Sequence, residues 1–175
     1  VATPLTQMGV EVHTADAGRP PLTIKGGQPK AIHYDLPMAS AQVKSCVLLA
    51  GLYAEGETSV TEPAPTRDHT ERMLQGFGCQ VQVEGDTVRL QGGQTLKGCS
   101  IDVPADISSA AFYMVAASIA PNSEITLRHV GVNPTRTGII DILKLMGGDI
   151  RVFNHKTVGG EPVADICVRS AALKG

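Results

Sequence analysis

The chain has few aromatic residues: three tyrosines, three phenylalanines and no tryptophan among 175 residues. Proteins that bind single-stranded nucleic acid stack bases on aromatic side chains, so this scarcity argues against such a surface. The net charge is −2 and no cationic arm is present, whereas non-specific nucleic-acid binding needs a concentrated positive field. The composition therefore predicts no nucleic-acid partner.

Long hydrophobic runs, paired cysteines and metal-binding motifs are also missing. The longest apolar helix expected, residues 107–120, is shorter than the roughly 20 residues that cross a bilayer, so no membrane association is predicted. The five histidines show no HxH or HExxH spacing, which predicts no metal site. The cysteines form no CxxC pair, and we expect reduced core residues in a cytoplasmic protein. They are Cys46, Cys79, Cys99 and Cys167.

An internal repeat with a spacing of 69 residues is what the chain does contain. Gly9, Gly78 and Gly147 each end a helix-like run and precede a strand-like run, and Pro65-Thr66-Arg67 recurs as Pro134-Thr135-Arg136. A fixed period of this kind is typical of repeat architectures. We therefore predict an α/β (α+β) fold of repeated units, each with the order strand, helix, strand, helix, strand, strand.

The expected elements follow from hydrophobic periodicity and turn residues. For the first copy they are strand 31–36, helix 39–53, strand 58–62, helix 67–77 and strands 79–83 and 88–91. For the second copy they are strand 99–103, helix 108–120, strand 124–130, helix 137–146 and strands 150–153 and 164–169, with a long loop before the last strand. Helices 39–53 and 108–120 are apolar almost all round, so we expect them to be buried.

The repeat also predicts that the sequence is an internal piece of a longer polypeptide. The similar segments Thr95-Leu96-Lys97-Gly98 and Ala172-Leu173-Lys174-Gly175 occupy matching places in the repeat. The first is followed by an expected strand and helix, whereas the sequence ends with the second. Val1 is not a methionine. About two repeated units would then be present.

Ser40 is the most informative candidate site residue. It lies at or next to the N-terminus of helix 39–53, where unpaired N–H groups and the positive end of the helix dipole favour an anion such as phosphate. Gln42 could direct an amide at the same ligand. The alternative is an ordinary serine cap, worth about 1 kcal/mol to the helix.

Arg67 and Asp106 are the next candidates. A cation at the start of a helix is unfavourable with respect to the dipole. We therefore expect Arg67 to bind either an external anion or a carboxylate partner such as Asp68 or Glu71. Arg136 is its repeat counterpart, and one of the two arginines could be architectural. Asp106 precedes helix 108–120 and is expected to cap it rather than to act as a catalytic carboxylate.

Three stretches resemble one enzyme family. They are PMASAQVKSCVLLAGL at residues 37–52, TRDHTERMLQGFG at 66–78 and NPTRTGIIDILKLMGGDI at 133–150. They are similar to 3-phosphoshikimate 1-carboxyvinyltransferases (EPSP synthases), of the bacterial type often associated with glyphosate tolerance. The resemblance implies two lobes of three βαβαββ units each, with buried central helices. Residues 1–103 would belong to the first lobe and 104–175 to the second.

The family transfers the enolpyruvyl group of phosphoenolpyruvate to the 5-hydroxyl of shikimate 3-phosphate, releases phosphate and needs no cofactor; glyphosate inhibits it. The resemblance implies that Ser40, the backbone of Ala41 and Arg67 bind shikimate 3-phosphate. Gln42 would contact the shikimate ring beside phosphoenolpyruvate. Some members have serine where Ala41 stands, which leaves one hydroxyl contact fewer. Val103, Pro104 and Asp106 would lie at the hinge between the lobes.

The family's acid–base and phosphoenolpyruvate-binding residues fall outside these 175 residues, so no catalytic residue is predicted here. We expect the chain alone to be inactive and to need the N- and C-terminal segments of the same enzyme. Two other classes remain open. UDP-N-acetylglucosamine enolpyruvyl transferase shares the fold, although SAQ at residues 40–42 fits the shikimate enzyme better. A DNA sliding clamp also repeats helices and sheets, but it needs basic helices, and helix 108–120 has no Lys or Arg.

Overall fold

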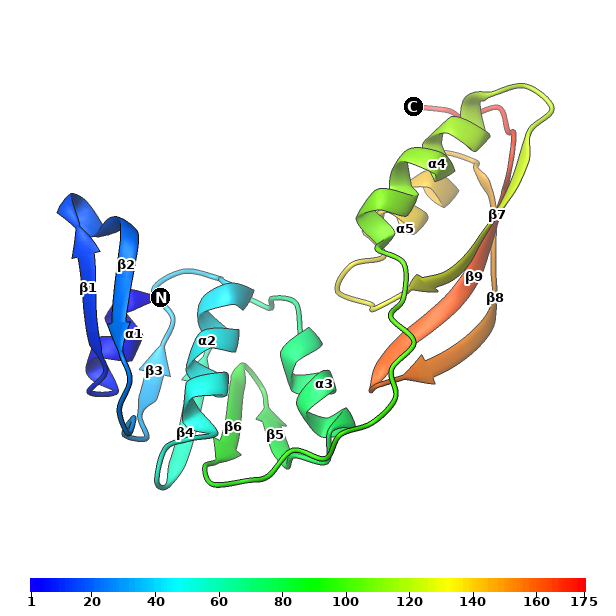
Figure 1. Ribbon diagram of the computed structural model, residues 1–175. Helices are drawn as coiled ribbons and strands as arrows, with labels where there is room; N and C mark the ends of the chain where they lie inside the picture. Colours follow the sequence, from blue (N-terminus) through cyan, green and yellow to red (C-terminus); the bar gives the residue numbers. More distant parts are fainter. The chain divides into compact units, whose positions relative to one another are not determined.

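The computed structural model describes all residues, 1–175, and divides them into two compact units, Val1–Gly98 (unit 1) and Cys99–Gly175 (unit 2). Each unit combines helices with β-sheet (Figure 1). No helix is both long enough and apolar enough to span a membrane. The lobe boundary expected at Val103–Pro104 stays a prediction.

Unit 1 contains three helices, a short 3-10 turn and six strands. In chain order they are α1 (Ala2–Gln7), β1 (Glu11–Ala15), η1 (Asp16–Gly18), β2 (Arg19–Lys25), β3 (His33–Asp35), α2 (Ala41–Gly51), β4 (Glu57–Thr61), α3 (His69–Gly76), β5 (Val81–Glu84) and β6 (Thr87–Gln91). β1 and β2 form a separate antiparallel hairpin. The expected order of elements from residue 31 to residue 91 is confirmed, with the helices shorter at both ends.

The main sheet of unit 1 is mixed, with strand order β3-β4-β6-β5. β3 runs parallel to β4, and the other neighbours are antiparallel. Helix α2 packs on β4 and β6, and α3 packs on β5. The core between these layers is built from aliphatic side chains such as Val47, Leu48, Val60 and Leu90. This packing brings the first turns of α2 and α3 close to each other.

Unit 2 repeats the arrangement with one strand fewer. Its elements are α4 (Ile107–Ile119), β7 (Glu124–Gly131), α5 (Gly138–Leu145), β8 (Asp149–Val158) and β9 (Glu161–Arg169). The sheet has the order β7-β9-β8 and is antiparallel throughout. The strand expected at residues 99–103 does not form. Only a single parallel bridge joins Ala105 to Val130, because Pro104 has no N–H to donate and disfavours regular pairing of the segment that it ends.

The closing hairpin of unit 2 also differs from the expectation of a long loop. β8 extends to Val158 and β9 begins at Glu161, so Gly159 and Gly160 alone form the turn. Both glycines have positive φ, 55° and 84°, which a tight two-residue hairpin requires and which glycine adopts without strain. The pairing of β8 with β9 therefore continues to Val158 and Glu161, through residues that were expected to form a loop.

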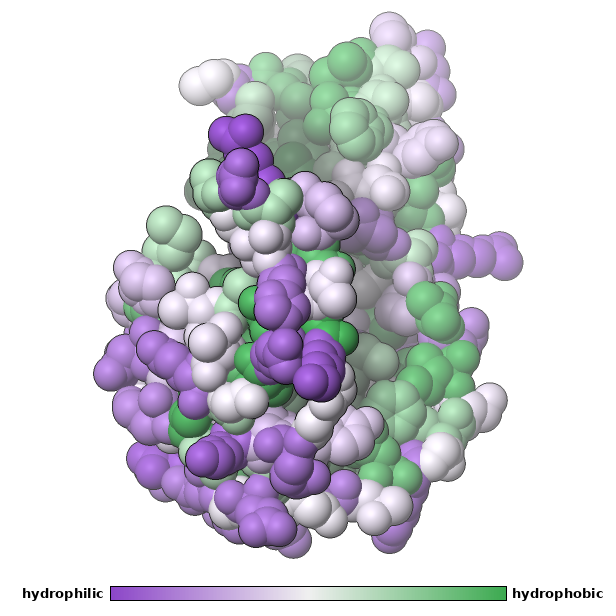
Figure 2. Space-filling model, turned by 60° about the vertical axis from the view of Figure 1, so that its left-hand side comes forward, coloured by the Kyte–Doolittle hydropathy of each residue, from purple (hydrophilic) through white to green (hydrophobic).

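One side of each apolar helix lies in the core of its unit, and the other side is exposed. Met114 in α4 is fully buried, whereas Phe112 is 79% exposed and Tyr113 is 60% exposed. In α2, Leu48 is buried and Leu49 is 47% exposed. Hydrophobic side chains are accordingly visible on the molecular surface (Figure 2). Each helix has one sheet to pack against in its unit, and that sheet covers only one side.

Candidate functional site

The site begins at the N-terminus of α2, which local sequence determines. Pro37 follows β3 and interrupts it, and Ser40 is the N-cap, with extended backbone angles (φ −150°, ψ 103°). Its hydroxyl oxygen accepts a hydrogen bond from the N–H of Val43 at 3.4 Å. The predicted position of Ser40 at the helix N-terminus is therefore confirmed. The hydroxyl is half-buried and keeps its own hydrogen for donation.

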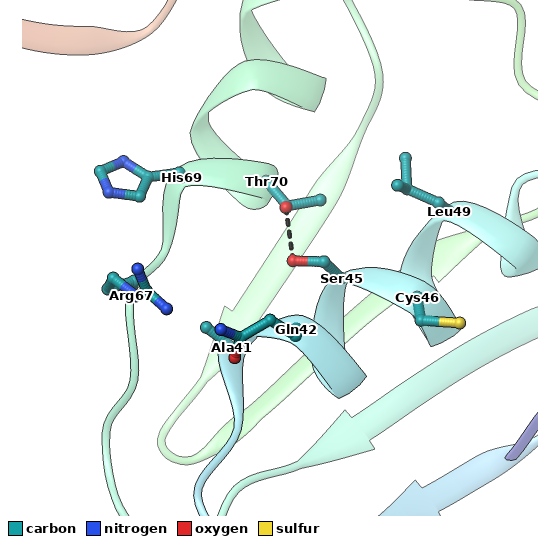
Figure 3. A pocket seen from close by; sticks show the side chains of 8 residues that line it. All are labelled: Ala41, Gln42, Ser45, Cys46, Leu49, Arg67, His69 and Thr70. Carbon is teal, nitrogen blue, oxygen red and sulfur yellow. Dashed lines mark hydrogen bonds between the residues drawn. The ribbon is translucent and has the colours of Figure 1, made fainter. Parts of the chain in front are cut away.

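A pocket of about 420 Å³ lies between α2 and the start of α3. Its lining residues are Ala41, Gln42, Ser45, Cys46, Leu49, Arg67, His69 and Thr70. Figure 3 shows Arg67 across the pocket from Gln42 and Ala41, with Cys46 and Leu49 further along α2. Three of the four predicted substrate-binding residues are thus brought together, and Ser40 precedes them at the cap without lining the pocket.

Arg67 has no ion-pair partner in the protein. Of the two carboxylates considered as partners, Asp68 is bonded to Arg72 at 2.8 Å, and Glu71 is bonded to Lys44 at 2.6 Å. Arg67 is exposed and lies just before α3, whose dipole does not favour a cation at that end. The guanidinium and the N-terminus of α2 together make this end of the pocket attractive to an anion.

A buried charge cluster connects α2 to the segment on either side of Arg67. Lys44, in the second turn of α2, is 1% exposed, and its Nζ lies 2.6 Å from Glu62 Oε1 and 2.6 Å from Glu71 Oε1. Thr66 Oγ1 donates to the other oxygen of Glu62. Desolvation lowers the pKa of Lys44, but the bonds to Glu62 and Glu71 outweigh it, so the pKa is raised and the lysine stays charged.

The remaining pocket residues are poorly suited to nucleophilic catalysis. Burial raises the pKa of the Cys46 thiol, whereas a reactive cysteine needs a lowered pKa. The hydroxyls of Ser45 and Thr70 are bonded to each other at 2.7 Å and join α2 to α3 (Figure 3). The arrangement is built to bind an anion.

In unit 2 the repeat counterpart of Arg67, Arg136, has an ion-pair partner within the protein. Arg136 Nη2 lies 3.2 Å from Asp106 Oδ1 and 2.5 Å from Ser108 Oγ. Asp106 caps α4 by accepting from the N–H of Ser109 at 3.0 Å. Desolvation raises the pKa of Asp106, but hydrogen bonds from Ser108 and Ser109 and the charge of Arg136 hold it below its ordinary value. The predicted cap role of Asp106 is confirmed, and of the two arginines only Arg67 is without an ion-pair partner.

Several pocket residues were missed by reasoning from sequence. Ser45, Cys46 and Leu49 follow Gln42 by three, four and seven residues, so all four share one side of α2. This spacing could have extended the predicted site beyond Gln42. Lys44 gave no such signal, because its partners lie far along the chain. Val103 is 79% exposed and lies with Pro104 in a stretch without regular structure. A hinge at Val103, Pro104 and Asp106 stays a prediction.

Fold and pocket together define a repeated α/β protein with an anion-attracting pocket at a helix N-terminus. Known proteins match it over its whole length. A family model for EPSP synthase (3-phosphoshikimate 1-carboxyvinyltransferase) matches residues 1–175. The 3-phosphoshikimate 1-carboxyvinyltransferases of Alkalilimnicola ehrlichii and Halorhodospira halophila are each 65% identical over 176 residues, which cover all of this chain. A solved EPSP synthase from Acinetobacter baumannii superposes with a TM-score of 0.91 and 59% identity over 99% of this chain.

The chain belongs to the EPSP synthase family. The predicted fold class, repeated units of the enolpyruvyl transferase fold, is confirmed. The chain spans 40% of the length of these two curated relatives and 40% of the solved chain.

Proposed function

We propose that this chain supplies the shikimate 3-phosphate-binding part of an enolpyruvyl transferase. The complete enzyme would transfer the enolpyruvyl group of phosphoenolpyruvate to the 5-hydroxyl of shikimate 3-phosphate and release phosphate. The observation that carries the proposal is the unpaired Arg67 facing the first turn of α2 across a pocket of about 420 Å³. Pockets of this volume hold small ligands.

Each residue has a role that its chemistry supports. Ser40 would donate its hydroxyl hydrogen to the phosphate, and the N–H of Ala41, in the first turn of α2, would donate beside it. Arg67 would supply the charge that the phosphate needs, through its planar fork of N–H donors. Gln42 would hydrogen-bond the ring with its amide, on the side where phosphoenolpyruvate binds.

The two-lobe organisation is part of the same proposal. Residues 1–103 would belong to the first lobe and residues 104–175 to the second, with Val103, Pro104 and Asp106 at the hinge. All four cysteines are free, but only Cys79 is buried and Cys99 is exposed, so the expectation that all four lie in the core is wrong. We propose a reducing compartment such as the cytoplasm. Because the family's acid–base residues are expected to lie outside these 175 residues, we propose that the chain alone does not turn over substrate and needs the remaining segments of the enzyme. Glyphosate would act only on the complete enzyme.

Binding of shikimate 3-phosphate, measured by calorimetry on the complete enzyme, tests this function. Arg67→Ala should weaken binding about 10-fold to 100-fold, since a hydrogen bond to a charged group contributes roughly 1.5–3 kcal/mol. Arg136→Ala is the matched control, because it removes the repeat counterpart that is already paired. Tighter binding of UDP-N-acetylglucosamine than of shikimate 3-phosphate would instead identify the sibling transferase. Equal effects of the two arginine substitutions would contradict the assignment of Arg67.

A phosphate-release assay with both substrates tests the second part of the proposal. The 175-residue chain should show only background release, and the complete enzyme should turn over. Turnover by the chain alone would overturn the proposal that the acid–base groups lie elsewhere.

A further inference from the structure

The Lys44 cluster, defined as Lys44, Glu62, Thr66 and Glu71, has no role in the binding proposed above, although it connects the two elements that line the pocket, α2 and the start of α3. Lys44 is two residues after Gln42 in α2. Glu62 follows β4, Thr66 immediately precedes Arg67, and Glu71 is in the first turn of α3. The cluster therefore joins α2 to the segment carrying Arg67 on both sides of that arginine.

The contacts are short and water is largely excluded from them. Nζ of Lys44 contacts one oxygen of each glutamate at 2.6 Å, and Lys44, Glu62 and Glu71 are each at most 9% exposed. Interactions between charges are screened little in such surroundings. The segment 62–71 is therefore held at a set distance from the first turns of α2.

Satisfying polar groups does not by itself explain the cluster. Glu71 Oε2 is buried and has no hydrogen-bond partner, and one lysine against two glutamates leaves a negative charge if all three are ionised. Buried ion clusters of this kind are often no more stabilising than apolar side chains of the same size. A role in defining geometry accounts for its presence better than a role in stability.

Unit 2 shows that the fold does not require these charges. At the spacing of 69 residues, the counterparts of Lys44, Glu62 and Glu71 are Tyr113, Gly131 and Ile140. Ile140 is buried in the core of unit 2, and Arg136 is there fixed directly by Asp106 and Ser108. The charge cluster thus occurs in the repeat whose arginine has no partner of its own.

We propose that Lys44 is a positioning residue, which through Glu62, Thr66 and Glu71 holds Arg67 opposite the N-terminus of α2. Arg67 cannot be fixed by an ion pair of its own if it is to bind a ligand anion. The backbone on either side of it is fixed instead, and the guanidinium stays available. This inference rests on the proposed binding of shikimate 3-phosphate at Arg67.

The test uses the complete enzyme with the cluster made neutral at nearly constant size: Lys44→Met, Glu62→Gln and Glu71→Gln together. We expect KM and Kd for shikimate 3-phosphate to rise about tenfold while kcat stays within about twofold, because small misplacements of a binding group weaken binding before they affect chemistry. When Arg67 is already replaced by alanine, the same three substitutions should cause no further loss of affinity for shikimate 3-phosphate. Val88→Ala, in β6 and away from the pocket, is the control for lost stability alone.

Amide hydrogen exchange gives a readout that needs no ligand. Exchange at residues 66–70 should be faster in the neutral variant and unchanged in Val88→Ala. Unchanged exchange and unchanged affinity in the neutral variant would refute the positioning role. An equal loss of affinity with and without Arg67 would also refute it, since Lys44 would then act independently of Arg67. If the unmodified enzyme does not bind shikimate 3-phosphate, the proposed function fails, and the exchange experiment still decides whether the cluster orders this segment.

Discussion

Replacement of Lys44 by methionine should strongly destabilise unit 1. The side chain is 1% exposed, and its removal leaves Glu62 and Glu71 buried without the cation that both contact at 2.6 Å. Breaking a buried ion pair by removing one partner costs about 3–5 kcal/mol, because the remaining charge stays desolvated. A folded domain is stable by only about 5–15 kcal/mol, so this single change removes a large part of the total.

Urea denaturation followed by circular dichroism measures the effect. With a urea slope of about 1–3 kcal/mol per M, the midpoint of unit 1 should fall by at least about 1 M. The melting temperature should fall by at least about 12 °C, at roughly 4 °C or more per kcal/mol for a unit of this size. Lys97→Met, an exposed lysine of the same unit, is the control and should change stability by less than about 0.5 kcal/mol.

The triple variant with Lys44→Met, Glu62→Gln and Glu71→Gln together separates the effect of lost charge from the effect of lost side-chain volume. Because it removes all three charges together, its stability should lie within about 1–2 kcal/mol of the unmodified chain. If Lys44→Met costs no more than Lys97→Met, or if the triple variant is as unstable as Lys44→Met, the account of Lys44 as the neutralising centre of a buried cluster is wrong.

The same cluster predicts a dependence on alkaline pH. The pKa of Lys44 is raised in the folded state above its ordinary value of 10.5, so its contribution to stability is fully present below 10.5 and is lost as the pH rises through the higher folded value. The urea midpoint of unit 1 should therefore fall above about pH 10.5. The triple variant should lack this loss.

Three further substitutions test other parts of the structure. Arg136→Ala should lower the stability of unit 2 by about 0.5–1 kcal/mol, as expected for a partly exposed ion pair. Asp106→Asn keeps the cap but removes a carboxylate whose pKa is lowered from 3.8. The stabilisation by this carboxylate is present above 3.8 and lost as pH falls through the folded value, so the variant should lose less stability below pH 4. Gly92→Ala would place a Cβ 1.9 Å from the carbonyl oxygen of Ala54 and should cost at least about 1–3 kcal/mol, unlike Gly27→Ala, which meets no atom within 4 Å.

Each of these substitutions has an outcome that contradicts its premise. Unchanged urea unfolding of unit 2 in Arg136→Ala would mean that the ion pair with Asp106 contributes nothing. An acid titration of Asp106→Asn that superimposes on that of the unmodified chain would remove Asp106 from the acid response. Equal melting temperatures for Gly92→Ala and Gly27→Ala would show that the backbone at Gly92 can move away from Ala54.

The repeat, the order of elements in unit 1 and the two helix caps could be predicted from the sequence alone. These features depend on neighbours along the chain. Ser40 and Asp106 cap their helices through N–H groups three residues away, and Gly78 and Gly147 follow helix ends with positive φ. The strand expected at residues 99–103 was wrong for the opposite reason, because a strand forms only if a neighbouring strand offers a matching edge, and such an edge is not visible in the local sequence.

Which of the two arginines has an ion-pair partner depends on the tertiary structure. Arg67 and Arg136 follow the same Pro-Thr motif, and nothing in their immediate neighbours separates them. Arg136 is paired with Asp106, 30 residues away, whereas the acidic residues near Arg67 are bonded to other cations. Lys44 meets Glu62 and Glu71 because α2 and α3 pack on one sheet. Such partners are selected by how the layers pack, and a charge pattern read along the chain does not contain that information.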